Sequence, residues 1–263
     1  MLEIAFRHRS SLVLVLVWPV LAWTVVAPPA TPLFLGLGAA LLVAGACLRL
    51  AAARCLGKGA RVHRAGAREG VVDWGPYAWS RNPLYIAAGL ILAGFSCLAG
   101  GEWLSLLLLP GTCLVYMPVV IHEEASIRAG GHEEYASYLT RVPRWIGLPR
   151  RAEETSPTRS PWSEVFRREK GLIPGLVLSS GAIVLAQRGI VPLRSLFESA
   201  HTATGVPPAA AAAVLLAVGA VINSVGIERK RHRREARRAA QAAAAAAAGD
   251  GDPSLESASA QEH

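Results

Sequence analysis

The chain has 263 residues, long enough for one or two domains, but its composition excludes an ordinary soluble fold. Hydrophobic residues make up 52% of it and charged residues 17%, whereas soluble proteins average about 25% charged. The mean hydropathy is +0.34. Because 27 Lys and Arg face 19 Asp and Glu, the net charge is +8, and these few charges must be separated from the apolar bulk. The combination favours a multi-span membrane protein over a disordered chain or a compact cytosolic domain.

Six long apolar runs follow one another along the chain. A helix needs about 20 apolar residues to cross the hydrocarbon core, within a range of about 17–25. The second, fourth and sixth runs meet this length, and the others need flanking residues or local thinning of the bilayer. The first run is interpreted as a span and not as a signal peptide, because Pro28 and Pro29 follow it directly. The runs are 11–27, 33–53, 84–98, 103–121, 172–187 and 206–227.

The basic residues indicate how these helices are oriented. With the N-terminus inside and six alternating helices, 25 of the 27 Lys and Arg fall on the inner side, and only Arg188 and Arg194 lie outside. Such asymmetry is what the positive-inside rule expects. The sequence therefore predicts an all-α, polytopic membrane bundle of about six transmembrane helices, with both termini cytosolic.

The chain divides by composition into four parts. Residues 1–150 form the predicted core, 151–171 a cytosolic linker, 172–227 an additional pair of transmembrane helices, and 228–263 a basic, Ala-rich and disordered tail. The basic run 229–238 follows a span directly and contains no aromatic residue. We therefore expect it to contact anionic lipid headgroups and expect no binding to nucleic acid. The oligomeric state stays open.

Several common chemistries are excluded by missing residues. The pair Gly36 and Gly38 lacks the preceding strand and the third glycine of a dinucleotide-binding fingerprint. Glu123 follows a histidine as in a zinc-protease helix, but Ser126 stands where the second zinc ligand belongs. The four cysteines have no short paired spacing, so neither a disulfide framework nor a metal site is expected.

The stretch 75–85, Gly-Pro-Tyr-Ala-Trp-Ser-Arg-Asn-Pro-Leu-Tyr, opens the third apolar run. Asn82 is a favoured N-cap residue and Pro83 suits the first position of a helix. One interpretation is only a helix start at the membrane surface, with Tyr77 and Trp79 in an interfacial aromatic belt. The other is a helix N-terminus that receives an anion, with Asn82 and Tyr85 on the same face.

A second stretch begins where the fourth apolar run ends. The negative charges of Glu123 and Glu124 are unfavourable at a helix C-terminus, so either the helix continues beyond them or the carboxylates bind a cation. A solvated interfacial face is the simpler alternative. After a break at Gly130 and Gly131, the sequence predicts a two-turn amphipathic cytosolic helix that Pro143 ends.

Taken together, the two stretches resemble the signature of the isoprenylcysteine carboxyl methyltransferase and phospholipid methyltransferase superfamily of integral membrane enzymes. That signature is Gly-x-Tyr-x-x-x-Arg-His-Pro-x-Tyr at the start of a span, then Glu-Glu after the next span and Glu-Tyr-x-x-Tyr-x-x-Arg-Val-Pro. The likeness covers about residues 70–146, and the ordered combination is specific. It implies methyl transfer from S-adenosylmethionine to a lipophilic acceptor at the cytosolic face of the membrane.

The resemblance also implies roles for individual residues. Arg144 would help to close the pocket. Two departures stand out: Asn82 replaces the usual His and has no titratable proton, and residues 129–132 replace the usual Phe-Gly. The implied catalytic residues are Arg81, Glu124 and Arg141, and the implied cofactor-binding residues are Tyr77, Asn82, Pro83, Leu84, Tyr85, Glu123, Tyr135 and Tyr138.

Two other functions stay open at this point. Some NADPH-dependent membrane reductases of sterols or steroids share a similar Arg-x-Pro-x-Tyr stretch, and a non-catalytic scaffold is compatible with Asn82. Among methyl acceptors, the sequence does not distinguish a prenylated cysteine, a phospholipid amine, an isoprenoid acid and a small secondary metabolite.

Overall fold

The computed structural model describes residues 27–56, 72–129, 133–148 and 159–189, with isolated positions between 16 and 24 and between 195 and 210. The chain divides into two compact units, Met1–Leu216 and Ala217–His263, and the second lies outside the described residues. Most of the predicted run 11–27, nearly all of 206–227 and the whole predicted tail 228–263 also lie outside them. All secondary structure in the described part is helical, as the sequence predicts.

Four of the predicted apolar runs form helices. They are α3 (Pro32–Cys55), α4 (Pro83–Leu98), α5 (Glu102–Ala129) and α8 (Leu172–Gln187). The predicted amphipathic helix is α6 (Glu133–Arg141). The 3₁₀ helix η1 (Gly75–Ala78) precedes α4, and α7 (Trp162–Arg168) lies in the segment predicted to be a linker.

Two of these helices are long and apolar enough to cross a membrane by themselves. They are α3 and α5. The helices α7 and α8 pass the same test only as a pair, bent by 50° at the break between them, and α4 is shorter. The described residues therefore contain two candidate spans, or three if the bent pair is one span. The predicted total of about six stays a prediction.

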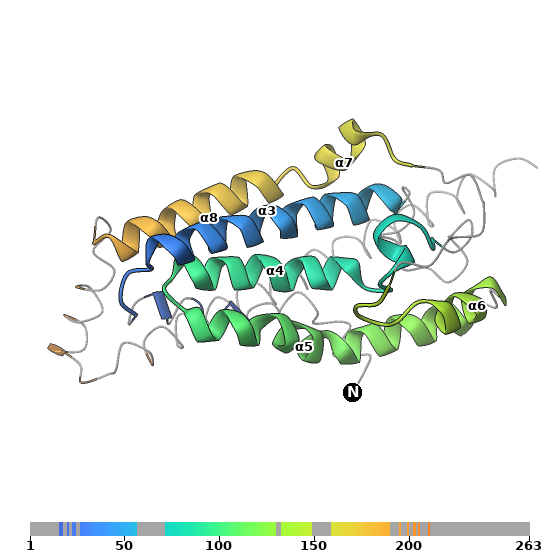
Figure 1. Ribbon diagram of the computed structural model, residues 1–263, viewed down its shortest axis with the longest axis horizontal. Helices are drawn as coiled ribbons and strands as arrows, with labels where there is room; N and C mark the ends of the chain where they lie inside the picture. The colour runs from blue at the N-terminus through green and yellow to red at the C-terminus, as the bar shows by residue number, and fades with distance from the viewer. Residues whose placement is uncertain are drawn as a thin grey trace, which may run out of the picture. The chain divides into compact units, whose positions relative to one another are not determined.

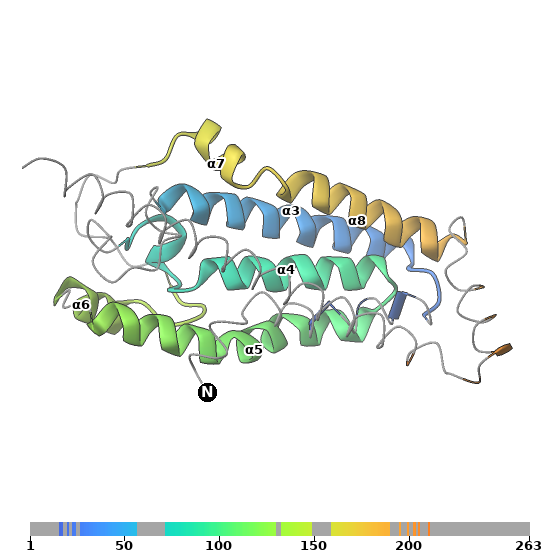
Figure 2. The ribbon, with the colours of Figure 1, turned by 180° about the vertical axis from the view of Figure 1, so that it is seen from behind.

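The apolar helices run side by side. In both ribbon views α4 lies between α3 and α5, and α8 runs along α3 (Figures 1 and 2). The turn 99–101 joins α4 to α5 directly, which makes these two helices antiparallel. Consequently the end of α3, the start of α4, the end of α5 and the helices η1 and α6 meet at one end of the bundle, called the signature end below (Figure 1).

Small residues bring α3 and α4 into close contact. A Cβ atom added at Gly38 would lie 2.9 Å from the carbonyl oxygen of Gly94, and one at Gly45 would lie 3.0 Å from that of Ala87. Membrane helices associate through such close backbone approach, because lipid provides no hydrophobic drive between them. The pairing of α3 with α4 fixes where α4 begins, and therefore where the signature residues stand.

We predict that Gly38→Ala weakens this packing. Replacing a helical glycine by alanine normally gains up to about 1 kcal/mol, but here the backbone of α4 must move. Overpacking of this kind costs about 1–3 kcal/mol. Gly36→Ala is the matched control, because nothing lies within 4 Å of a Cβ at Gly36. Thermal unfolding in detergent should give a lower midpoint temperature for Gly38→Ala than for Gly36→Ala. Equal midpoint temperatures would contradict the close packing.

Candidate active site

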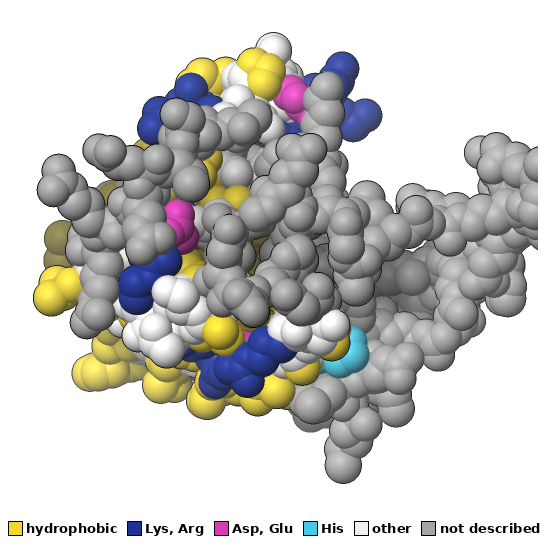
Figure 3. Space-filling view, turned by 90° about the vertical axis from the view of Figure 1, so that its right-hand side faces the viewer, with side chains coloured by type: hydrophobic (Ala, Val, Ile, Leu, Met, Phe, Trp, Pro, Cys, Tyr) yellow, Lys and Arg dark blue, Asp and Glu magenta, His cyan; other side chains and the backbone are white. Residues whose placement is uncertain are grey.

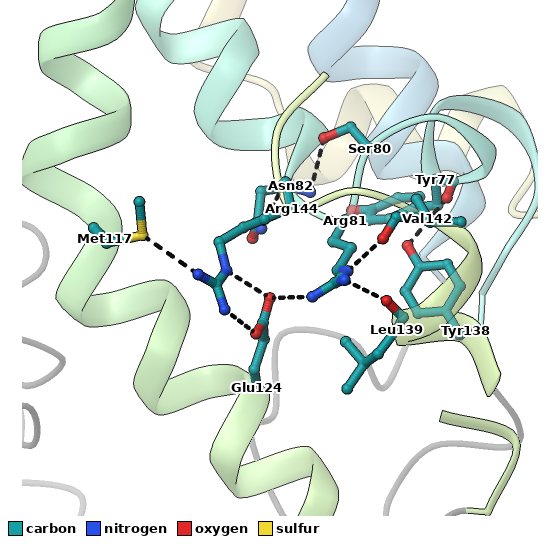
Figure 4. Close-up of polar contacts among 10 residues, drawn as sticks. All are labelled: Tyr77, Ser80, Arg81, Asn82, Met117, Glu124, Tyr138, Leu139, Val142 and Arg144. Atoms are coloured by element: carbon teal, nitrogen blue, oxygen red, sulfur yellow. Dashed lines mark hydrogen bonds and ion pairs between the residues drawn. The ribbon is translucent and has the colours of Figure 1, made fainter. Parts of the chain in front are cut away.

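The signature end is held together by one carboxylate. Glu124 on α5 is only 6% exposed. Its Oε1 accepts hydrogen bonds from Nη1 of Arg81 and from Nε of Arg144, each at 3.1 Å, and its Oε2 accepts one from Nη2 of Arg144 at 2.8 Å (Figure 4). Arg144 thus binds Glu124 with two parallel bonds, the geometry in which guanidinium and carboxylate interact most strongly. These bonds raise the pKa of Arg144 above its usual value.

Arg81 also closes the C-terminal end of α6. Its Nε donates to the carbonyl oxygen of Val142 at 2.6 Å, and its Nη2 donates to that of Leu139 (Figure 4). Carbonyls at the end of a helix have no partner within the helix, and a cation suits the negative end of the helix dipole. One side chain therefore joins the start of α4, the end of α6 and α5.

The backbone after α6 runs beside the segment that precedes α4. The amide of Arg81 donates to the carbonyl oxygen of Pro143 at 3.1 Å, and the amide of Gly147 donates to that of Trp79 at 3.1 Å. Asn82 occupies the predicted N-cap position, but its side chain does not cap α4. Its Nδ2 instead donates to the carbonyl oxygen of Arg144 at 3.0 Å. The expectation that this side chain caps the helix is therefore corrected.

The tyrosines of α6 are buried, and one of them contacts η1. The hydroxyl of Tyr138 donates to the carbonyl oxygen of Tyr77 at 3.0 Å, and the ring of Tyr135 lies 6.0 Å from that of Tyr138. Burial raises the pKa of Tyr138 far above its ordinary value, so this hydroxyl keeps its proton and acts as a donor. Tyr77 packs with Ala52 and Cys55 of α3. It is thus a buried core residue.

A second polar contact lies on the other face of the Glu-Glu pair. The hydroxyl of Tyr85 on α4 donates to Oε2 of Glu123 at 3.3 Å. The ring of Tyr85 stacks on Tyr116 of α5, with centroids 4.5 Å apart and planes inclined by 27°. Successive residues of a helix point about 100° apart, so Glu123 and Glu124 contact different partners. Tyr85 at the start of α4 and Glu123 near the end of α5 are therefore in contact.

The remaining predicted residues are placed nearby. Arg141 forms an ion pair with Asp73, with Nη2 and Oδ2 3.3 Å apart. Pro83 is fully buried, and Leu84 packs beside Tyr77 and Cys55. The structure thus gathers the predicted residues at one end but assigns them different contacts. The charges of Arg81, Glu124 and Arg141 are engaged within the chain, whereas Tyr85 and Glu123 form a separate group.

Sequence reasoning missed two participants. Tyr116 lies seven residues before Glu123, which places both on one face of a helix, and this spacing would have been a usable signal. Asp73 precedes the signature, and no local pattern distinguishes it as the partner of Arg141. Among the described residues, no group of three or more His, Cys, Asp or Glu stands close enough to bind a metal ion.

Basic side chains gather at the signature end. The view onto this end shows Lys and Arg clusters among apolar side chains (Figure 3). Arg54 lies over the ring of Trp162, 4.5 Å from its centroid, and Arg159 lies 5.0 Å from that of Trp74. At the other end of the described bundle, Arg188 is the residue after α8. The positive charge of the described part is therefore asymmetric along the helices.

The family comparison matches the core of this arrangement. Residues 33–129 match the family model described as phospholipid methyltransferase. The matched region contains α3 from its second residue, η1, α4 and the whole of α5, and so includes the first signature stretch and both glutamates. The resemblance seen in the sequence is thereby confirmed. No curated protein and no solved structure matches the chain.

We predict that Glu124→Gln destabilises the signature end. The substitution keeps the shape of the side chain but leaves two guanidinium groups facing a neutral amide. Removing one partner of a buried ion pair costs about 3–5 kcal/mol, and because the side chain of Arg144 is 36% exposed, we expect about 2–3 kcal/mol here. Thermal unfolding in detergent measures this loss.

Glu102→Gln is the control for that experiment. Glu102 begins the same helix, is exposed and lies at its opposite end. We expect it to unfold as the unmodified protein does. Equal stability of the Glu124 and Glu102 variants would show that the carboxylate does not hold the three segments together.

Proposed function

We propose that this chain, which matches the phospholipid methyltransferase family model over residues 33–129, transfers a methyl group from S-adenosylmethionine to a lipophilic acceptor at the membrane surface. The observation that carries the proposal is the contact between Tyr85 and Glu123. It joins the start of α4 to α5 at the end of the bundle where the signature predicts the methyl donor.

The residues at this contact fit a cationic donor. Glu123 supplies a carboxylate that attracts a sulfonium or an ammonium group. Tyr85 and Tyr116 supply aromatic rings, and a cation above such a ring is attracted by its negative face. S-adenosylmethionine, when bound, supplies a methyl group on a positively charged sulfur. The residues of this chain would hold and orient it, and methyl transfer requires mainly such alignment.

The contacts of the other signature residues support a division of roles. Glu124 and Arg81 bind each other and hold the end of α6 over the site. The amide group of Asn82 is hydrogen-bonded to the carbonyl oxygen of Arg144. We therefore assign Arg81, Glu124 and Asn82 to positioning. In this proposal, residues 133–147 form the segment that closes the cofactor pocket.

The chemistry of Asn82 also favours one class of acceptor. An amine must lose a proton before it attacks a methyl group, whereas a carboxylate is already ionised at pH 7. Asn82 stands where the family usually has a histidine and has no proton to exchange near neutral pH. An acceptor that needs no base, such as the carboxylate of a prenylated cysteine or an isoprenoid acid, suits this site better than a phospholipid amine.

We also propose that the site faces the cytosol. The apolar helices and the family match identify an integral membrane protein. The asymmetry of its Lys and Arg supports a cytosolic signature end, because loops rich in these residues stay inside. A methyl donor made in the cytosol would then reach the site without crossing the membrane.

Donor binding tests the proposal. Titration calorimetry with the purified chain in detergent should detect S-adenosylmethionine, and Glu123→Gln should weaken its binding about tenfold or more, because a hydrogen bond to a charged group contributes about 1.5–3 kcal/mol. Tyr85→Phe removes the hydroxyl that orients Glu123 and should weaken binding less. Glu102→Gln should bind as the unmodified chain does.

Two results would contradict the proposal. Tight binding of NADPH with no binding of S-adenosylmethionine would indicate a reductase instead. Binding of neither would indicate a non-catalytic membrane protein.

A further inference from the structure

A cavity lies beside the proposed donor site, between α8 and the helices of the family core. Its volume is about 680 Å³, within the range of about 300–1,000 Å³ that is usual for small-molecule pockets. One wall belongs to α8, which lies outside the family match. The helix therefore contributes to this chain a binding space that the matched region does not form by itself.

The cavity is apolar along most of its length. Ile91, Leu92 and Phe95 line it from α4, and Leu176 and Ile183 line it from α8. Such walls favour hydrocarbon over water. Polar and charged side chains stand where the break between α7 and α8 approaches α3, at Arg49 and Glu169. The cavity thus has a polar end, toward the signature end, and an apolar interior.

The polar end adjoins the proposed donor site. Tyr116 of α5 lines the cavity. Its ring stacks on that of Tyr85, with the ring centroids 4.5 Å apart, and Tyr85 contacts Glu123. Ala88, one turn after Tyr85 on α4, also lines the cavity. From Ala88 to Phe95 the helix rises about 10 Å. A chain lying along α4 would therefore begin next to the donor site and extend toward the opposite end of the bundle.

Polar contacts fix α8 at both of its ends. Near its start, Nε of Arg49 donates to Oε2 of Glu169 at 2.9 Å. At its last residue, Nε2 of Gln187 donates to the carbonyl oxygens of Thr24 and Ala99, at 2.8 and 3.2 Å. Between these anchors Ile183 is the one α8 residue that is buried. Contacts near both of its ends therefore fix α8, and among the described residues the cavity lies between the middle of this helix and α4.

We infer that this cavity binds one hydrocarbon chain of the methyl acceptor, with α8 as the wall that limits the length of that chain. The inference rests on the proposed function, which places the reacting group of the acceptor beside Tyr85 and Glu123. An apolar chain gains about fourfold in binding for each methylene group it buries. Filling the cavity should therefore lower binding of long chains more than that of short ones.

Two tryptophan substitutions on the same helix test the cavity. Leu176 lines it, whereas Leu178 does not line it and is 72% exposed. Leu176→Trp should fill the cavity, and Leu178→Trp adds the same side chain on the outer face. The probe is a 16-carbon fatty acid with a diazirine near its terminal carbon, and mass spectrometry identifies the peptides that it labels after irradiation.

We expect labelling of α4 and α8 peptides that line the cavity. Leu176→Trp should reduce this labelling roughly fifteenfold, the effect of losing about two buried methylene groups, and Leu178→Trp should leave it unchanged. Because a tryptophan at 176 also adds strain, Leu176→Ala serves as a second variant, and its larger cavity should raise labelling by a 20-carbon probe relative to the 16-carbon probe. Equal labelling of the two tryptophan variants, or labelling confined to other peptides, would overturn the inference.

Calorimetry with S-adenosylmethionine on the same preparations separates the two proposals. Donor binding with equal labelling of the two tryptophan variants would retain the methyltransferase and reject the cavity as the chain site. Selective labelling without donor binding would retain the lipid site and reject the methyltransferase.

Discussion

The geometry of the signature end depends on the burial of one charge. A carboxylate removed from water must be paired and hydrogen-bonded, or its desolvation costs several kcal/mol. Glu124 satisfies this requirement with Arg81 and Arg144, which come from before α4 and after α6. Three segments far apart in the sequence are therefore brought together by one side chain. The hydrogen bonds of Asn82, Tyr138 and Gly147 join the same segments.

The adjacent glutamates consequently have different partners. Glu124 faces the two arginines and is buried, whereas Glu123 is partly exposed and faces Tyr85. An α-helix turns each residue by about 100° from the previous one. The two neighbouring carboxylates therefore point in different directions and bind different partners.

Much of the fold could be predicted from local signals. Pro83 marked the start of α4, and the last apolar residue of the run, Leu98, is the last residue of the helix. The bounds of α8 agree with the run 172–187. The fourth apolar run ends at 121, and α5 continues beyond it through polar residues to Ala129, one of the two alternatives that the glutamates left open. Hydropathy indicates where the apolar segment ends and not where the helix ends. The arginines that bind Glu124 stabilise the polar extension of α5.

Other features of the site had no local signal. The helix α7 is short and carries several charges, so neither length nor periodicity identified it. The ion pair between Arg81 and Glu124 was not expected from the sequence, because pairing between segments 43 residues apart is a property of the tertiary structure. The partnership of Tyr85 with Tyr116 and the cavity beneath α8 likewise arise only when helices pack. The types of residue at this end of the bundle were therefore predictable from the sequence, and the contacts that each of them makes were not.

The most direct test of the account is the fate of a labelled methyl group. Membranes that contain the chain, incubated with methyl-labelled S-adenosylmethionine, should transfer label to an extractable lipid fraction, and membranes with Glu123→Gln should transfer little. Identification of the labelled lipid would show whether the acceptor is a carboxylate on a hydrocarbon chain. Equal label in the lipids of membranes with and without the chain would contradict the account.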